Sequence, residues 1–344
     1  MDILTLLLIV PVLTVIAIII SRTQNQIRMS AAVGMGVQLI QTINLIFAYL
    51  AERRNGNIDD MLFVKSWMWF KSFNIQFSIG VDGISVALIA LTGIVIFTGV
   101  LTSWKVDNLS KEFFISLIVL TTGVFGFFIS LDLFTMFLFF ELAVIPMYLL
   151  IGVWGSGPKE YAAMKLTLML MGASALLLLG ILGLYVNSSA APGGLMTFNI
   201  IELSKLNIPI EVQRIFFPML FIGFGVLGAL FPFHTWSPDG HSSAPTAVSM
   251  LHAGVLMKMG GYGCLRVAMF LMPDAANEMG WIFIVLTSIS VVYGAFGAIV
   301  QKDLKYINAY SSVSHCGLVL FAILMSDKIS TNGAVLQMIS HGLM

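Results

Sequence analysis

Long apolar runs separated by short polar connections dominate the chain. The apolar runs cover residues 3–20, 29–50, 80–103, 113–130, 131–153, 161–185, 215–233, 246–271, 279–300 and 306–325. A helix needs about 20 largely apolar residues to cross a bilayer. The pattern therefore predicts an all-α polytopic membrane protein with about ten transmembrane helices. A last apolar segment runs from Gly333 to Met344 and is expected to begin an eleventh helix of a longer chain.

Composition agrees with a membrane protein. Of 344 residues, 58% are hydrophobic and only 10% are charged, against roughly a quarter charged in ordinary soluble domains. The net charge is zero, so no basic surface indicates a nucleic-acid partner and the expected surroundings are the lipid bilayer. Cys264 and Cys316 lie inside apolar runs without CxxC spacing. We therefore expect no metal or redox cofactor held by this chain.

The polar connections give a first indication of orientation. Residues 51–79 are expected to lie at headgroup level, anchored by Trp67, Trp69 and Phe70. The stretch Leu195 to Val212 is too short and polar to span and is expected to be a surface loop or a short interfacial helix. When the long 51–79 connection is left out, the positions of Lys and Arg in the loops favour an external N-terminus.

Three titratable residues lie near the middle of apolar runs. They are Glu141, Lys258 and His315. Charge at this depth costs several kcal/mol and usually has a partner or a function, so the three residues predict a path for protons or ions. For Glu141, a structural hydrogen bond to a neighbouring helix is the alternative. Asp132 starts the same helix on its opposite side and is expected to contact the membrane surface or another subunit.

Further polar groups lie near Lys258. The lysine is surrounded by glycines that allow close helix packing, and His252 lies about 9 Å before it along the helix axis. The proline-rich joint from Phe231 to Val248 carries His234 and His241 with spacing that fits no familiar metal signature. These two histidines are expected either to satisfy backbone groups at a broken helix or to shape a proton entrance.

A row of hydroxyls precedes the third candidate. Ser311, Ser312 and Ser314 lead along one helix to His315. Such a row can hold water in single file, whereas a buried neutral histidine bonded to a neighbour is the simpler interpretation.

Five motifs together carry a family resemblance. They are DGIS from Asp82 to Ser85, FFELAVIPMYLLIGVWG around Glu141, the HTWSPDGHSSAPTAV joint, LMKMGGYGCLR around Lys258 and NAYSSVSHCGLVL around His315. In order and in register from about residue 70, the chain resembles the antiporter-like membrane subunits of proton-pumping NADH:quinone oxidoreductase, respiratory complex I. Within that family it resembles the chain M (chain 4) type.

The resemblance implies an architecture. It comprises inverted five-helix repeats with a broken helix in each, divided here as helices 1–3 in residues 1–112, a first repeat in 113–271 and an incomplete second repeat in 272–344. The expected partners are chains L and N and the small membrane chains of the complex. The expected location is the cell inner (plasma) membrane. NAD, FMN, iron-sulfur clusters and quinone are expected in partner subunits.

The resemblance also implies residue roles. Glu141 would be the carboxylate of a coupling Glu–Lys pair, Lys258 the central relay lysine, Lys165 an auxiliary base and His315 a link to a second half-channel. His341 is a secondary candidate. One position departs from the family, because Leu227 stands where a lysine is usual. His252 or Lys165 is expected to replace that lysine, and a complex using an electron donor other than NADH is compatible with the change.

The expected function is proton translocation as a subunit of an NADH:quinone reductase, coupled to quinone reduction elsewhere in the complex. The alternatives are a subunit of a multi-chain sodium/proton antiporter, the membrane arm of a hydrogenase, or a passive structural spacer. Retention of Glu141, Lys258 and His315 argues against the spacer, since an inert chain has no reason to bury charge.

Overall fold

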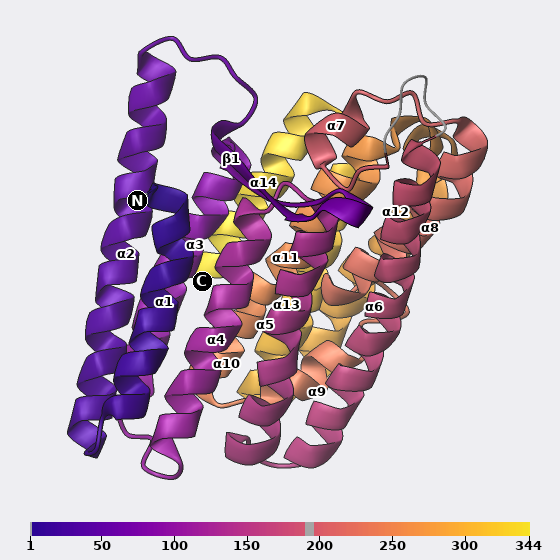
Figure 1. Cartoon of the computed structure of the whole chain (residues 1–344). Coiled ribbons are helices and arrows are strands. Elements are labelled where there is room, and N and C mark those ends of the chain that lie inside the picture. Colours follow the sequence, from indigo (N-terminus) through magenta and orange to yellow (C-terminus); the bar gives the residue numbers. More distant parts are fainter. Residues whose placement is uncertain (1, 190–195) are drawn as a thin grey trace.

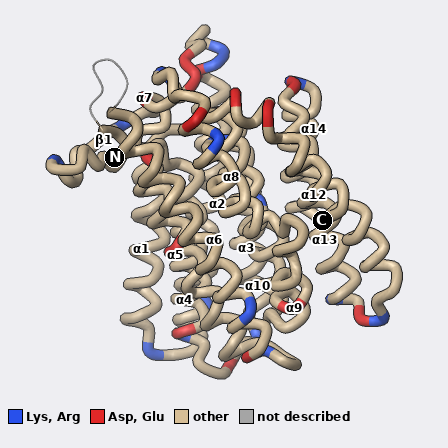
Figure 2. Tube along the Cα trace, turned by 90° about the vertical axis from the view of Figure 1, so that its right-hand side faces the viewer, with Lys and Arg blue, Asp and Glu red and all other residues tan. Residues whose placement is uncertain are grey.

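The computed structural model describes residues 2–189 and 196–344. Its long helices stand side by side, and the short connections gather at the two ends of the bundle (Figure 1). Most Lys, Arg, Asp and Glu residues lie at those ends, and few lie between them (Figure 2). A bilayer imposes this division, because its core accepts backbone only as internally bonded helices and excludes most charge. The chain is a multi-pass membrane protein.

Within the described residues, nine helices are long and apolar enough to span. They are α1 (Ile3–Ile20), α2 (Gln24–Arg54), α3 (Gly83–Thr102), α4 (Ser110–Ile129), α5 (Leu133–Trp154), α6 (Lys159–Ser188), α8 (Ile210–Leu227), α12 (Pro273–Val300) and α13 (Leu304–Leu324). The predicted run 246–271 is also helical, but two π-helical turns interrupt it. It consists of α10 (Thr246–Leu251), a turn at His252–Leu256, α11 (Met257–Gly263) and a turn at Cys264–Met269. The final apolar segment is α14 (Lys328–Leu343).

Polar caps decide where several helices begin. Thr23 and Asp82 each form a reciprocal capping box with the residue three positions later, Gln26 and Ser85. The DGIS motif is therefore the start of α3. Asp132 caps α5 by accepting hydrogen bonds from two backbone amides. These side chains satisfy amides that a helix end leaves free.

The connection 51–79 was expected to lie at headgroup level, and no strands were predicted in it. It holds an antiparallel hairpin of β1 (Leu62–Phe70) and β2 (Ile75–Val81), joined by a 3₁₀ turn at Lys71–Phe73. Trp67 and Trp69 remain about half exposed on β1. Apolar and polar residues alternate along β2, which is largely buried, whereas β1 shows no regular alternation and is mostly exposed.

The predicted helix break is confirmed, and it follows the end of α8. Pro218 lies inside α8, which continues to Leu227. The chain then turns through residues 228–235 and resumes helix at α9 (Trp236–Ser243). Upstream, residues 200–204 form the short helix α7 (Ile200–Ser204), while Leu195 lies outside the described residues. The predicted start of α8 at residue 215 was wrong, since it begins at Ile210.

Glycines near Lys258 allow close packing, as predicted. A Cβ added at Gly260 would lie 2.7 Å from the carbonyl oxygen of Phe224 on α8. One at Gly254 would lie 3.2 Å from the carbonyl oxygen of Gly342 on α14. The segment carrying Lys258 is therefore held against two neighbouring helices at backbone contact distance.

Connections after the odd-numbered apolar runs meet at one end of the bundle. Arg28 pairs with Asp107 across two of them, and Trp154 Nε1 donates to the Asn108 carbonyl at 2.8 Å. Lys305 Nζ donates to the Ala244 carbonyl at 3.1 Å. This grouping matches the loop assignment behind the predicted orientation. Which end faces outward stays a prediction, as does the division at residues 112 and 271.

Candidate functional site

Glu141 lies in the middle of α5 and faces α6. The residue is half-buried, and its Oε1 has no hydrogen-bond partner among the described residues. The Ser174 hydroxyl on α6 lies within interaction range of the carboxylate. No cation is therefore bonded to Glu141 in the part of the chain that the structure describes.

A narrow apolar void adjoins this position. Its walls come from α5, α6, α8, α9 and the segment after α10, and the lining residues are Val144, Met147, Leu166, Leu170, Leu227, Trp236, His252 and Leu256. Val144 follows Glu141 by three residues, so the two share one face of α5. Leu170 likewise lies one turn before Ser174 on α6. Leu227 stands where the family resemblance implies a lysine, and it lines the same void as His252. This void lies about one helical turn from Glu141 along α5.

Lys258 is fully buried and bound to a histidine. Its Nζ contacts Nδ1 of His341 on α14 and donates to the Ala253 carbonyl. His341 Nε2 contacts the Ser312 hydroxyl at 3.2 Å, and that hydroxyl also bonds the Asn308 carbonyl at 3.0 Å. Residues from α11, α14 and α13 thereby form one hydrogen-bonded chain.

The donor and acceptor groups fix the direction of each hydrogen bond between Lys258 and Asn308. The Asn308 carbonyl only accepts, so the single Ser312 hydroxyl proton points to it. His341 Nε2 must then donate to Ser312, which leaves Nδ1 as the acceptor for the Lys258 ammonium. A proton passed from Lys258 to His341 Nδ1 would therefore release the proton on Nε2 toward Ser312.

His315 joins the same group from the side. Its ring centroid lies 5.0 Å from that of His341, and its Nδ1 contacts Gln337 Nε2 of α14 at 2.9 Å. The hydroxyl row before it does not form a single file. Ser312 turns to His341, whereas Ser314 donates to the Val291 carbonyl of α12 at 2.8 Å.

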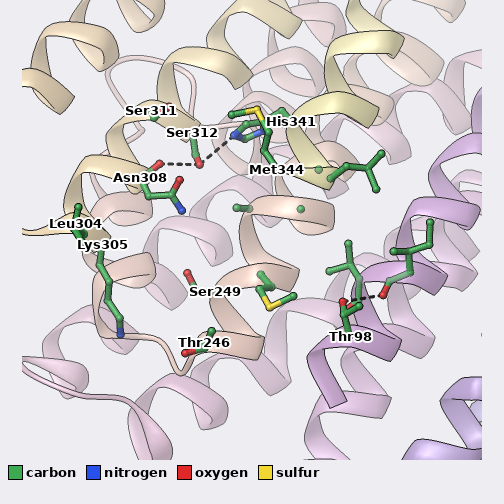
Figure 3. Close-up of a pocket in the computed structure, with 17 residues that line it drawn as sticks. Thr98, Thr246, Ser249, Leu304, Lys305, Asn308, Ser311, Ser312, His341 and Met344 are labelled. Carbon is green, nitrogen blue, oxygen red and sulfur yellow. Dashed lines mark hydrogen bonds between the residues drawn. The ribbon is translucent and has the colours of Figure 1, made fainter. Parts of the chain in front are cut away.

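A cavity with both polar and apolar lining residues, which we call the polar cavity after its hydroxyl, amide and imidazole groups, opens beside these hydrogen bonds (Figure 3). It has a volume of about 520 Å³ and lies between α3, α10, α13 and α14. Ser249 and Thr246 lie on one wall, and Asn308, Ser312 and His341 lie on another. The inner end of the hydrogen-bonded chain therefore meets a space that is large enough to hold water.

Lys165 pairs with a residue that sequence reasoning missed. Its Nζ lies 2.7 Å from Asp239 Oδ2 on α9, and the Tyr306 hydroxyl donates to the other oxygen at 3.3 Å. On α6, Lys165 and Ser174 are nine residues apart, about 13.5 Å along the axis and on opposite sides. Lys165 is thus directed to α9, about two and a half turns from the part of α6 that faces Glu141.

The two histidines of the joint take different places. His241 Nδ1 lies 2.8 Å from the Ser249 hydroxyl. His234 packs against Phe231 and Tyr293, away from Lys258, and its Nδ1 has no hydrogen-bond partner among the described residues. The structure therefore brings His241, but not His234, toward the polar cavity.

The expected role of Asp132 was wrong. The residue is fully buried within its own chain and forms a bridge with Asn199. Its Oδ1 accepts from the backbone amides of Phe134 and Thr135, each at 3.0 Å. Burial raises the pKa of Asp132 to about 6. Helix capping, rather than contact with lipid or another subunit, accounts for its position.

A buried ion pair fixes the far end of the Lys258 segment. Arg266 pairs with Asp82, the cap of α3, and also contacts the Tyr262 hydroxyl at 3.3 Å. Both charged side chains are largely buried. The DGIS and LMKMGGYGCLR motifs thus meet in space.

Comparison with known proteins agrees with this geometry. A family model described as NADH:quinone oxidoreductase/Mrp antiporter, TM matches residues 130–344. The chain belongs to this family. It is 34% identical over its whole length to "NADH-quinone oxidoreductase subunit M" of Rickettsia prowazekii, of which it covers 69%. Over 81% of its length it is 40% identical to "NAD(P)H-quinone oxidoreductase chain 4-2" of Synechocystis sp., of which it covers 49%.

The fold agrees as well. A chain of respiratory complex I from Thermus thermophilus superposes with a TM-score of 0.87 at 21% identity, over 98% of this chain and 68% of that chain. The antiporter-like fold inferred from the five motifs is confirmed. The chain spans about half the length of the first relatives that it matches.

Proposed function

We propose that this chain is a proton-translocating membrane-arm subunit of an NADH:quinone oxidoreductase of the complex I type. The observation that carries the proposal is the directed chain from Lys258 through His341 to Ser312 at the edge of the polar cavity. Nitrogen bases bind protons at accessible pH, whereas hard cations such as calcium or magnesium are bound by several oxygens. The buried groups therefore favour proton transfer over sodium transport.

Lys258 and His341 would exchange one proton at a time. The lysine N–H bond would break as a bond forms at His341 Nδ1. The Nε2–H bond would break as a bond forms at Ser312 Oγ, whose own proton would leave into the polar cavity. The pair would return to its starting state when the imidazole carries its proton on Nε2 again and Lys258 is protonated from the other side. Glu141 would supply that proton, with His252 near Leu227 in place of the usual lysine. An inert spacer would gain nothing from burying a lysine against a histidine.

The remaining expectations follow from this assignment. The complex would lie in the inner (plasma) membrane with chains L and N and the small membrane chains as neighbours, and the N-terminus would be external. NAD, FMN, iron-sulfur clusters and quinone would be held by partner subunits. This chain would contribute to the enzyme as a translocase subunit, without redox chemistry of its own.

Glu141→Gln in the complete reconstituted complex tests the proposal. The amide keeps the shape but cannot exchange a proton, so coupled proton uptake should fall by roughly a hundredfold, the scale of losing one positioned acid or base. Glu112→Gln, at the first turn of α4, is a matched control outside the proposed path. Wild-type proton uptake and quinone reduction in an assembled Glu141→Gln complex would refute the proposal.

A further inference from the structure

An apolar groove lies between the β1–β2 hairpin and the outer face of α5. Its volume is about 560 Å³. The hairpin forms one wall with Trp67, Met68 and Trp69 of β1 and with Phe77 of β2, and the first half of α5 forms the other. Figure 1 shows the hairpin lying across one end of the bundle. The groove therefore begins at that end.

Aromatic contacts hold the two walls together. Trp67 packs on Phe77 with ring centroids 5.8 Å apart, and Phe77 packs on Phe139 of α5 at 6.3 Å. Trp67, Met68 and Trp69 are nevertheless 44%, 48% and 51% exposed. The groove is thus formed by the packing of the chain itself and is open along its outer side.

The lining selects a ligand with a long hydrocarbon part. The only hydroxyl belongs to Thr135, which is buried and donates to the Asp132 carbonyl at 3.1 Å. All other lining residues are Trp, Met, Phe or Leu. A sugar, a nucleotide or an extended peptide would lose hydrogen bonds to water here without replacing them.

The length of the groove matches part of one bilayer leaflet. Thr135 and Leu142 mark its extent on α5, and seven residues of helix are about 10 Å long. Half of the hydrocarbon core is about 15 Å thick. Leu138 is 38% exposed and Leu142 is half-buried, so the groove faces the surroundings of the bundle over this length. One acyl chain of a phospholipid would fill it.

The hairpin also supplies charge for a headgroup. Residues 62–81 contain two lysines, Lys65 and Lys71, and no aspartate or glutamate. Lys65 pairs with Asp2. Lys71 is exposed and has no ion-pair partner in the part of the chain that the structure describes. An unpaired ammonium therefore follows Trp69 by two residues, and half-exposed tryptophans are typical of the headgroup level.

We propose that this groove binds one acyl chain of an anionic phospholipid whose phosphate pairs with Lys71. A lipid that leaves the bilayer for the groove exchanges one hydrocarbon environment for another, so its acyl chain gives no preference among headgroups. The lysine then decides which headgroup is held. Lipid binding here is independent of the proposed proton translocation.

Photo-crosslinking in the complete complex tests the site. The complex is reconstituted with phosphatidylglycerol or phosphatidylcholine that carries a diazirine on one acyl chain, at the same mole fraction, and labelled peptides are identified by mass spectrometry. Phosphatidylglycerol should label the peptide containing Leu138 about fivefold more than phosphatidylcholine does, the effect of one basic side chain near an anionic headgroup. The outer face of α1, where Ile16 is exposed, should show no such preference.

Two kinds of variant separate the headgroup from the groove. Lys71→Gln should remove the preference for phosphatidylglycerol and leave labelling by phosphatidylcholine unchanged. Lys105→Gln, at an exposed lysine beyond the other end of α3, is the matched control and should keep the preference. Leu138→Trp fills the groove from α5 and Met68→Trp fills it from β1, so each should lower labelling by both lipids.

Three results would overturn the proposal. They are equal labelling of the wild-type groove by the two lipids, a preference that survives Lys71→Gln, and labelling that is unchanged in both filled variants. Cross-linking of the groove to a partner chain in place of lipid would also overturn it, because a protein segment would then be the occupant.

Discussion

Lys258 and His341 contact each other through Nζ and Nδ1 although 83 residues separate them in the chain. Both side chains are buried, and Ser312 holds the far nitrogen of the histidine. The contact joins the interrupted helix around α11 to α14. Protonation of either residue therefore directly changes the proton affinity of the other.

This contact predicts strong coupling between two substitutions. Lys258→Met and His341→Gln should each lower coupled turnover, and the double variant should be less impaired than the sum of the two losses. The interaction should amount to about 1–3 kcal/mol, as for residues in one hydrogen-bonded network. Turnover of the four forms of the assembled complex gives this value, and additive losses would show that the two residues act independently.

Leu227 offers a rescue experiment. If His252 replaces the lysine that is usual at position 227, His252→Ala should lose proton uptake and Leu227→Lys in the same chain should restore much of it. The two side chains share one void, so the new ammonium would occupy space next to the lost imidazole. Proton uptake by reconstituted single and double variants measures this. Failure of an assembled double variant to recover would indicate that His252 has another role.

The Asp82–Arg266 pair predicts a stability effect. Replacing Asp82 by Asn leaves Arg266 as a buried, unpaired charge, which typically costs about 3–5 kcal/mol. Asp82→Asn with Arg266→Met should be less destabilised than Asp82→Asn alone. Thermal inactivation of the purified complex would report both, and a double variant worse than the single would contradict a simple ion-pair role.

Asp132 predicts a pH effect on stability. Burial raises its pKa from the ordinary 3.8 to about 6, so the folded chain holds this proton more tightly than the unfolded chain. The resulting stabilisation is complete below pH 3.8 and is lost as pH rises through about 6. Asp132→Asn still accepts hydrogen bonds as a cap but does not titrate, so it should remove this part of the pH dependence. The thermal unfolding midpoints of the wild type and of Asp132→Asn, measured between pH 5 and 8, would show this difference, because the range includes the pKa of about 6. The same pH profile in both proteins would contradict a raised pKa at Asp132.

The lengths of the apolar runs were sufficient to predict the long membrane-spanning helices, because the bilayer fixes helix length and excludes charge. The predicted helix ends were less accurate, because capping residues such as Thr23 and Asp82 decide where a helix begins, and the limits of an apolar run do not. The hairpin at residues 62–81 was missed, and only Ile75–Val81 carries the alternation of apolar and polar residues that is typical of a strand.

The site was predictable only in part. Depth in an apolar run was enough to single out Glu141, Lys258 and His315. The pairing of Lys258 with His341 and of Lys165 with Asp239 depends on how distant helices pack, which no local pattern encodes. His241 also stacks on His252, with ring centroids 4.2 Å apart, and this contact likewise depends on the π turn and on Gly240.

The most direct test of the central claim is proton uptake by the complete reconstituted complex carrying Lys258→Met, measured together with quinone reduction. Lys258 is the only lysine or arginine that is fully buried among the described residues, and its substitution removes the donor to His341. Both rates should fall together, by roughly a hundredfold, in a complex assembled to the wild-type level. Wild-type proton uptake and wild-type quinone reduction in that assembled complex would contradict a relay through Lys258.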